Sequence, residues 1–323
     1  MGYFIEDGSV YFAVSDVHSC LSALEDALSL AGFDANNGKH KLIVCGDVFD
    51  RGYETLELYD FLMSLNQDRV TFIRGNHEAL FTTMLGKDFP DQHDFSNGTV
   101  RTFCAIAGVD EKEMDPSYWY INQLFMLGSK TSDADGGEAK KSALDVWRAV
   151  KKAVAGSDIA NWIANGRWLN YLEIGDYVFV HNFVPTSLRK SYAGLAELLM
   201  YSLDASAFEY RPDWRSATDF EWEDAAWGNC AKQFYLGQFK PETDKGKKLV
   251  CGHIHANNVR RMLGDLKSKD EEDDSAFDRD GLIVLDGNTA NSGVVNVLVL
   301  ENGSHRLITT QLSEAERNRK AGS

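Results

Sequence analysis

Short apolar runs that end in charged or imidazole side chains recur along this sequence and constrain its fold more than any other feature. In LIVCGDVFDRG, residues 42–52, four apolar residues run into Gly46, and two aspartates and an arginine follow. The run has the composition of a strand buried on both faces, and the glycine marks a sharp turn. Ligands bind at such strand ends in open α/β sheets. Taken alone, the motif also fits turn-forming aspartates beside a surface arginine.

The first part of the chain alternates between strands and helices. We expect strands at 10–15, 41–45 and 70–74 and helices at 19–30, 54–65 and after Asn76. This βαβαβ order predicts a parallel sheet. From residue 171 onward strands follow without long helices between them, which predicts a second, largely antiparallel sheet. Its expected strands are a hairpin over 171–182 that turns at Gly175, and segments at 248–255, 281–287, 294–301 and 305–312.

Two stretches of different composition, residues 86–167 and 186–246, interrupt this pattern. They are rich in helix formers and aromatic residues, and all seven tryptophans fall within the span that they bracket. Large aromatic side chains more often fill a small satellite core than shape a substrate cap, and both interpretations stay open. We predict one domain over residues 1–323 with two helical, tryptophan-rich insertions and an acidic loop at 265–280.

Composition and charge limit the classes of function. With 44% hydrophobic and 25% charged residues, the 323-residue chain is typical of a globular protein with a substantial core. Its net charge of −16 makes nucleic acid an unfavourable partner. Five dispersed cysteines without a C-x-x-C pair favour a reducing, cytoplasmic compartment. No segment has the apolar length of a membrane span, so no membrane partner is expected.

The expected core strands end in side chains that bind metal ions or transfer protons. Five of the eight histidines stand at such ends, which argues against a structural role for all of them. Carboxylate, carboxamide and imidazole donors without cysteine suit a reactive site rather than structural zinc. They are too many for one ion: Asp16, His18, Asp47, Asn76, His181, His253 and His255. Two ions that share one bridging carboxylate would clamp an in-line displacement at phosphorus.

The motifs DxH, GDxxDRG, GNHE, a single histidine and GHxH occur in this order, and with them the chain resembles the calcineurin-like metallophosphoesterases. Within that family it resembles the branch of phosphoprotein phosphatases, the bacteriophage lambda-type phosphatase and the symmetrical diadenosine tetraphosphate hydrolase. The resemblance runs from about Tyr11 to Leu300 apart from the two insertions. It implies an α/β fold of the metallophosphatase type: a β-sandwich of two mixed sheets flanked by helices, with helical insertions.

The resemblance also implies a role for each site residue. The first metal ion would be held by Asp16, His18 and His255. The second would be held by Asn76, His181 and His253. Asp47 would bridge the two divalent ions, for which manganese is expected before iron, zinc or magnesium. His77 would be the acid that protonates the leaving oxygen, oriented by Asp50, and Arg51 would bind phosphate.

These roles agree with elementary chemistry. A metal-bound water loses its proton near neutral pH and attacks phosphorus, so that no protein nucleophile is required. His77 adjoins a ligand, which puts it near the leaving group, and a carboxylate partner raises the pKa of a histidine. A guanidinium such as that of Arg51 supplies a planar, bidentate clamp for phosphate oxygens.

Three departures from the family pattern leave the substrate open. His255 is present, although phosphoprotein phosphatases usually lack the second histidine of GHxH. Asn229 stands where the branch carries a second phosphate arginine, and we expect it to contact substrate there. His181 is followed by NFVP rather than by Ala or Gly.

We therefore expect a hydrolase of phosphomonoesters, whose phosphorylated substrate is a small molecule or a phosphoprotein. Hydrolysis of a dinucleoside polyphosphate or of a small phosphodiester is the alternative, favoured by His255 and by the missing second arginine. A non-catalytic scaffold of the same fold is the interpretation from another class. Loss of ligands or of the acid would mark a scaffold, and the sequence has lost none of them.

Overall fold

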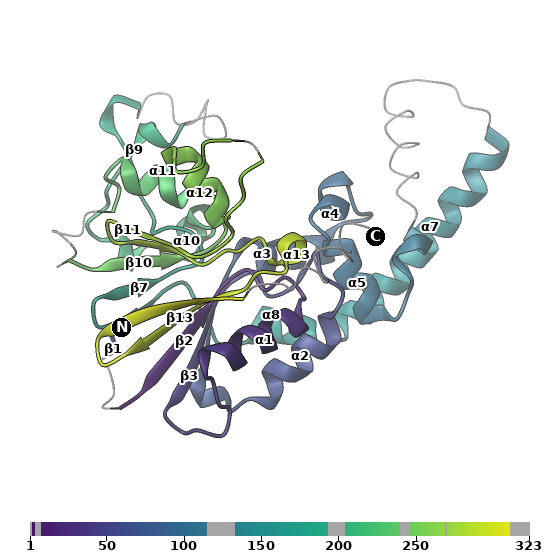
Figure 1. Cartoon of the computed structure of the whole chain (residues 1–323). Helices are drawn as coiled ribbons and strands as arrows, with labels where there is room; N and C mark the ends of the chain where they lie inside the picture. Colours follow the sequence, from purple (N-terminus) through teal and green to yellow (C-terminus); the bar gives the residue numbers. More distant parts are fainter. Residues whose placement is uncertain are drawn as a thin grey trace.

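Two six-stranded sheets pack face to face, and helices cover the outer face of each (Figure 1). The computed structural model describes residues 2–3, 8–114, 133–192, 204–239, 244, 246–268 and 270–310. This αββα sandwich of two mixed sheets confirms the predicted fold class. None of the helices in the described ranges is long and apolar enough to cross a membrane.

The first sheet has the strand order β14-β13-β2-β3-β4-β5. Its centre is the predicted βαβαβ unit: β2 (Val10–Val14), α1 (Leu21–Ala31), β3 (His40–Cys45), α2 (Thr55–Ser64) and β4 (Val70–Ile73). These three strands are parallel, as predicted. The sheet is extended by β5 (Trp168–Leu169), β13 (Asn296–Glu301) and β14 (Ser304–Thr309).

The second sheet has the strand order β1-β6-β7-β10-β12-β11. Its strands are β1 (Gly2–Tyr3), β6 (Leu172–Ile174), β7 (Tyr177–Phe179), β10 (Lys248–Cys251), β11 (Phe277–Arg279) and β12 (Leu282–Val284). β6 and β7 form the predicted hairpin. β11 takes up three residues of the expected acidic loop and pairs with β12 at the edge of the sheet.

The prediction that this sheet is largely antiparallel was wrong. β7, β10 and β12 pair in parallel, and β13 and β14, which were expected here, belong to the first sheet. Parallel neighbours need a long crossover, and the segments after β7 and β10 provide one. They carry α10 (Asp219–Ala225), α11 (Cys230–Tyr235) and α12 (Ala256–Leu263). The prediction failed because an apolar run indicates a strand but not whether it pairs in parallel or antiparallel.

The remaining helices lie mainly beside the first sheet. They are α3 (Asn76–Gly86), α4 (Gln92–Ser96), α5 (Thr99–Ala107), α7 (Asp133–Ala155), α8 (Asp158–Asn165) and, near the C-terminus, α13 (Thr289–Ser292). Single-turn helices occur at Gln67–Arg69, Glu111–Met114, Lys190–Tyr192, Ala205–Ala207 and Trp214–Ser216. β8 (Ser187–Leu188) and β9 (Phe208–Glu209) form a separate two-stranded ribbon.

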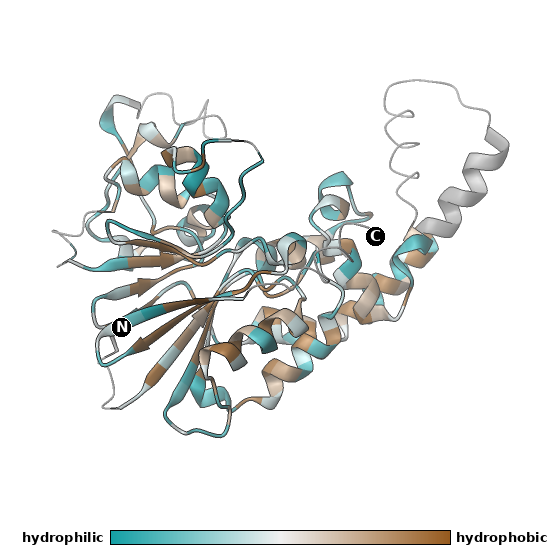
Figure 2. Cartoon of the chain, viewed as in Figure 1, coloured by the Kyte–Doolittle hydropathy of each residue, from teal (hydrophilic) through white to brown (hydrophobic). Residues whose placement is uncertain are grey.

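Alternate side chains of the central strands fill different cores. In β3, Ile43 belongs to the core between the sheets, whereas Val44 belongs to the core beneath the helices. In β7, Phe179 faces the inner core and Val178 the outer core of the second sheet. Strands that are covered on both faces are apolar throughout, so they appear as continuous apolar runs in the sequence. Figure 2 shows these strands mostly in brown, the colour of hydrophobic residues.

Five of the seven tryptophans pack in or against these cores. Trp147 lies fully buried in the core of the first sheet, and Trp162 and Trp168 pack against that core. Trp214 and Trp222 belong to the outer core of the second sheet. Trp227 is 44% exposed, and Trp119 lies outside the described residues.

The inner core yields a prediction about stability. Phe179 has no exposed surface and lies between the two sheets. We expect Phe179→Ala to lower the free energy of unfolding by about 3–5 kcal/mol, because it removes buried contacts and leaves a cavity. Chemical denaturation measures this. Phe220→Ala, at a side chain that is 65% exposed, is the matched control and should change the value by about 0.5 kcal/mol or less. Equal losses of unfolding free energy in the two variants would contradict the placement of Phe179 in the inner core.

Candidate metal centre

The C-terminal ends of strands from both sheets converge at one edge of the sandwich, and the predicted site residues lie there. They come from the ends of five strands. β2 leads to Asp16 and His18, β3 to Asp47, β4 to Asn76, β7 to His181, and β10 to His253 and His255. All but His253 and His255 are buried. Side chains that are distant in the sequence thus meet within hydrogen-bonding distance.

The loops that carry these side chains have an unusual backbone. Six predicted site residues have positive φ angles between 50° and 73°: Asp16, His18, Asp47, Asp50, Arg51 and His253. Non-glycine residues rarely adopt this conformation, which costs about 1–3 kcal/mol for each residue. The surrounding structure must supply that energy. Such clusters of strained residues are typical of functional sites.

Gly46 lets the two sheets approach each other at the site. Its φ is +82°, and a Cβ atom placed there would lie 2.5 Å from Nδ1 of His181 and 2.7 Å from Cα of Gly75. No side chain fits in that space. The glycine that ends β3 is therefore required by the close approach as well as by the turn.

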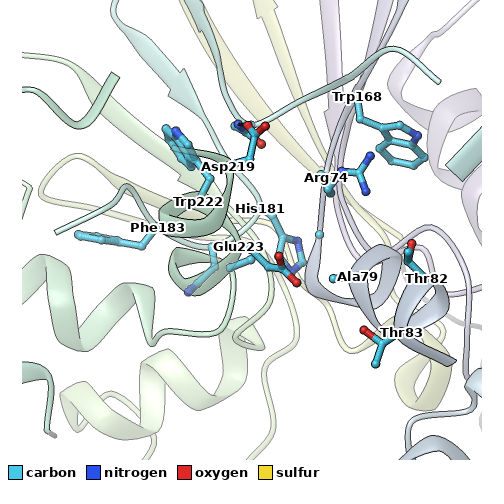
Figure 3. Close-up of a pocket in the computed structure, with 14 residues that line it drawn as sticks. Arg74, Ala79, Thr82, Thr83, Trp168, His181, Phe183, Asp219, Trp222 and Glu223 are labelled. Atoms are coloured by element: carbon cyan, nitrogen blue, oxygen red, sulfur yellow. Dashed lines mark hydrogen bonds between the residues drawn. The ribbon is translucent and has the colours of Figure 1, made fainter. Parts of the chain in front are cut away.

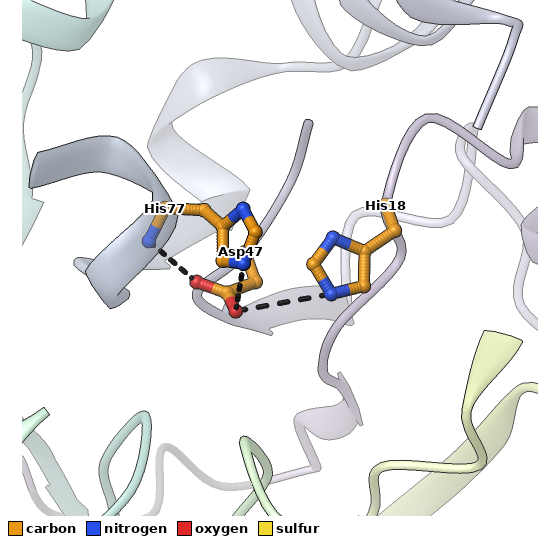
Figure 4. A group of neighbouring side chains, drawn as sticks. All are labelled: His18, Asp47 and His77. Atoms are coloured by element: carbon orange, nitrogen blue, oxygen red, sulfur yellow. Dashed lines mark hydrogen bonds and ion pairs between the residues drawn. The ribbon is translucent and has the colours of Figure 1, made fainter. Parts of the chain in front are cut away.

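Asp47 is shared by two groups of potential metal ligands. One group consists of His18, Asp47 and His77 (Figure 4), and the other of Asp47, His181 and His253. Its Oδ1 lies 3.4 Å from Nε2 of His181, and its Oδ2 lies 3.8 Å from Nε2 of His18. Burial, followed by the charges of Asp16 and Glu78, raises the pKa of Asp47 well above its usual value.

The rings of His181 and His253, both in the second group, approach the amide oxygen of Asn76. Nδ1 of His181 lies 2.9 Å from the carbonyl oxygen of Cys45, and because a carbonyl only accepts, this nitrogen carries the proton. Nε2 of the same ring lies 2.9 Å from Oδ1 of Asn76. Nδ1 of His253 lies at the same distance from that oxygen. One amide oxygen and two ring nitrogens thus converge, and all three are atoms that can ligate a divalent cation.

His18 gives a second indication that the site suits a cation. Its Nδ1 donates to the carbonyl oxygen of Phe49 over 2.9 Å, whereas its buried Nε2 has no hydrogen-bond partner. Burial, followed by the charge of Arg51, lowers the pKa of His18 well below its usual value. The ring is therefore neutral, which is the form that binds metal ions. Orphaned buried nitrogens are uncommon in folded proteins, and a metal ion would satisfy this one.

His77 lies between a carboxylate and a guanidinium. Its Nδ1 is 2.7 Å from Oδ2 of Asp50, and its Nε2 is 3.2 Å from Nη2 of Arg51. The hydroxyls of Thr99 and Thr102 donate to the Asp50 carboxylate over 2.8 and 2.7 Å. Burial raises the pKa of Asp50 to about 6. Burial, followed by the charge of Arg51, lowers the pKa of His77 well below its usual value.

The first group differs from the predicted ligand set. The structure brings His77 together with His18 and Asp47, where Asp16 and His255 were expected. The Asp16 carboxylate accepts from the backbone N–H of His253 at 3.0 and 3.1 Å. His255 is 27% exposed, and its Nε2 lies 3.8 Å from Oδ2 of Asp286. The positive charge of Arg51 makes Nε2 of His77 a poor ligand for a cation. The roles of Asp16 and His255 stay predictions.

Sequence reasoning missed Glu78, although the GNHE motif contains it. This buried carboxylate accepts backbone hydrogen bonds from Gly75 at 2.7 Å, Val48 at 3.0 Å and Asp47 at 3.1 Å. It therefore joins the loop after β3 to the loop after β4. The three bonds fix the backbone of Asp47 next to the start of α3.

Three other residues of the site were also missed. Thr99 and Thr102 lie on α5, inside the predicted insertion at 86–167, and no local signal connects them to Asp50. Asp286 follows β12 and is buried near Asp16, whose charge adds to burial in raising the pKa of Asp286. Its segment VLDG repeats the pattern of an apolar strand that ends in a carboxylate, which was an available signal.

Asn229 has a structural role in addition to any contact with substrate. It is the N-cap of α11, and its Oδ1 accepts from the backbone N–H of Lys232 over 2.9 Å. The Lys232 ammonium pairs with Asp204, an aspartate outside the metal groups. This capping bond uses the side-chain oxygen of Asn229. A contact between Asn229 and phosphate remains a prediction.

The hydrogen bonds of Glu78 generate a test. We expect Glu78→Gln to lower the free energy of unfolding by about 1–3 kcal/mol, because an amide cannot accept all three bonds and leaves buried N–H groups unpaired. Less metal should also be retained, since the Asp47 loop loosens. Denaturation and elemental analysis measure the two effects. Glu25→Gln, at an exposed glutamate of α1, is the control. A Glu78→Gln protein with unchanged stability and metal content would refute this role.

Comparison with known proteins places this geometry in context. The chain is 39% identical over 70 residues to the symmetrical bis(5'-nucleosyl)-tetraphosphatase of Buchnera aphidicola, a stretch that covers 22% of this chain and 24% of that protein. It is 27% identical over 94 residues to the asymmetrical bis(5'-nucleosyl)-tetraphosphatase PrpE of Oceanobacillus iheyensis, covering 27% and 38%. The chain thus spans about a quarter to two fifths of these relatives.

Solved structures with a similar chain course include two phosphatases. A cold-active protein-tyrosine phosphatase of a Shewanella species has 15% identity and a TM-score of 0.48, with 96% of this chain and 83% of that chain covered. A protein serine/threonine phosphatase of Saccharomyces cerevisiae has 12% identity and a TM-score of 0.43, with 95% and 81% covered.

The family itself is established by a longer match. The model of the calcineurin-like phosphoesterase family matches residues 11–285, which is most of the chain and contains every predicted site residue. The protein therefore belongs to the calcineurin-like phosphoesterase family.

Proposed function

We propose that the protein hydrolyses phosphomonoesters with two divalent metal ions bound around Asp47. The observation that carries this proposal is the position of Asp47 in both groups of buried donors, with Arg51 and the His77–Asp50 pair beside them. The unpartnered Nε2 of His18 and the convergence of His181 and His253 on Oδ1 of Asn76 support the presence of cations.

The ligand sets that we propose are those expected from the sequence. Asp16, His18 and His255 hold one ion, and Asn76, His181 and His253 hold the other. Asp47 contacts both. When bound, the ions would neutralise phosphate charge and lower the pKa of the water that attacks phosphorus. We propose manganese before iron, zinc or magnesium, because the donors are imidazole, carboxylate and carboxamide.

The chain's own groups would bind the substrate and transfer a proton. Arg51 donates to phosphate oxygens, for which a guanidinium offers paired N–H groups. Asp50 holds Nδ1 of His77 and thereby aims Nε2 at the leaving oxygen. Burial and then the charge of Arg51 lower the pKa of His77, and bound phosphate would neutralise the Arg51 charge. Nε2 could then carry the proton that the leaving group needs.

A dinucleoside polyphosphate is the second candidate substrate. Both curated relatives named above are bis(5'-nucleosyl)-tetraphosphatases by name. The supporting feature in this chain is the presence of Asn229 rather than a second arginine, because a monoester dianion gains more from two cationic clamps than a diester does. Phosphoproteins and small phosphodiesters are further candidate substrates. None of the five cysteines forms a disulfide, in keeping with our proposal of a cytoplasmic protein.

The bridging role of Asp47 is tested by Asp47→Asn. We expect this change to abolish hydrolysis of p-nitrophenyl phosphate after Mn(II) reconstitution and to lower the metal content, because an amide is a weak bridge between cations. The control is Asp60→Asn, at an exposed aspartate of α2. Elemental analysis that finds two tightly held ions in the Asp47→Asn protein would rule out the bridge.

The acid role of His77 predicts a dependence on the leaving group. We expect His77→Asn to keep the metal content and to lower kcat for an alkyl phosphate by about 100-fold or more, the scale of a lost general acid. The loss for p-nitrophenyl phosphate should be smaller, because nitrophenolate leaves without a proton. Steady-state kinetics on both esters decide the matter, and equal losses would show that His77 is not the acid.

A further inference from the structure

A cavity of about 400 Å³ opens beside the candidate metal centre, between the two sheets. Figure 3 shows Arg74, Thr82 and Trp168 on the side of the first sheet and α3, and Asp219, Trp222 and Glu223 of α10 across from them. The volume falls within the range of pockets that bind small organic molecules. The proposed chemistry does not use this cavity.

The cavity shares residues with the metal centre. His181 lines it, and Nε2 of the same ring lies 3.4 Å from Oδ1 of Asp47. Gly75 also lines it and directly precedes Asn76. A phosphate held at the metal centre would therefore place the organic part of its ester within reach of the cavity. A group that is covalently attached to that phosphate is the occupant that this position favours.

One wall offers a flat, polarisable surface. The guanidinium carbon of Arg74 lies 5.8 Å from the centre of the Trp168 ring. Nη2 of Arg74 also donates to the carbonyl oxygen of Ile163 over 3.2 Å, which holds the guanidinium in place. Indole and guanidinium groups both stack on planar aromatic rings such as nucleobases.

The opposite wall offers hydrogen-bond acceptors that repel phosphate. Oδ1 of Asp219 accepts from Nδ2 of Asn170, 3.0 Å away, and both residues line the cavity. The Glu223 carboxylate makes no side-chain hydrogen bond or ion pair with any residue that the structure describes, and it faces the cavity. Carboxylates accept from hydroxyl and amino groups. They also keep further phosphates out of the cavity and at the cationic site.

We propose that this cavity binds the nucleoside of a nucleotide substrate. The base would stack on Trp168 and Arg74, and the sugar hydroxyls or the exocyclic amine would donate to Glu223 and Asp219. Together the two walls favour an uncharged ligand that has a planar ring and several hydrogen-bond donors. This inference rests on the proposed function, because it assigns the nucleoside to a substrate whose phosphate the metal centre hydrolyses.

Adenosine is the probe that separates the cavity from the metal centre, since it has no phosphate. We expect it to bind the full-length protein without added metal, measured by calorimetry or ligand-observed NMR. Thr83→Trp fills the cavity from an exposed position on α3 and should weaken adenosine at least tenfold. Phe220→Ala removes an exposed aromatic ring from α10 outside the cavity and should leave the affinity unchanged. Glu223→Ala, a smaller change at the opposite wall, should weaken adenosine about threefold or more.

Kinetics of the Mn(II)-loaded protein provide the second readout. Thr83→Trp should lower the ratio of kcat/KM for diadenosine tetraphosphate to that for p-nitrophenyl phosphate by at least tenfold. Absence of saturable adenosine binding, or equal affinity in wild type, Thr83→Trp and Glu223→Ala, would overturn the inference. A selective loss on phosphopeptides instead of nucleotides would also overturn it. If the variants weaken adenosine but no phosphoester is hydrolysed, the nucleoside site stands and the proposed function falls.

Discussion

The burial of several carboxylates at one sheet edge is the constraint on which the rest of the site depends. Asp16, Asp47, Glu78 and Asp286 are each at most 2% exposed, and burial together with their mutual repulsion raises the pKa of Asp47 and of Asp286. Such a cluster is unfavourable unless hydrogen bonds or cations compensate it. Glu78 is compensated by three backbone N–H groups. Asp47 accepts one such bond, from His77, and is surrounded by imidazole nitrogens. Divalent ions would supply the compensation that Asp47 lacks.

The sandwich makes this cluster of carboxylates possible because the C-terminal ends of parallel strands from both sheets lie next to it. β2, β3 and β4 bring Asp16, Asp47 and Asn76 from one sheet. β7 and β10 bring His181 and His253 from the other. Gly46 then allows the sheets to approach closely, because its missing side chain leaves room for the His181 ring and the Gly75 backbone. The packing of Phe179 and Ile43 between the sheets therefore sets the distances among donors that lie more than a hundred residues apart in the chain.

Much of this site could be predicted from the sequence, because each donor follows an apolar strand within a short motif. The parallel order of β2, β3 and β4 and the hairpin of β6 and β7 were readable for the same reason. Other features depend on tertiary contacts. The direction of β10 and β12, the bonds from Thr99 and Thr102 to Asp50, and the cavity between α3 and α10 arise from segments distant in sequence. The positive φ angles of Asp47 and Arg51 are likewise imposed by their surroundings.

The central claim is that two metal ions share Asp47, and electron paramagnetic resonance of the Mn(II)-loaded protein tests it most directly. Ions about 3.5 to 4 Å apart, the spacing of two-metal hydrolase sites, are magnetically coupled. The account predicts the multiline spectrum of a coupled Mn(II) pair when two equivalents are bound. A spectrum of isolated Mn(II) ions at that loading, in protein that is folded and active on p-nitrophenyl phosphate, would contradict it.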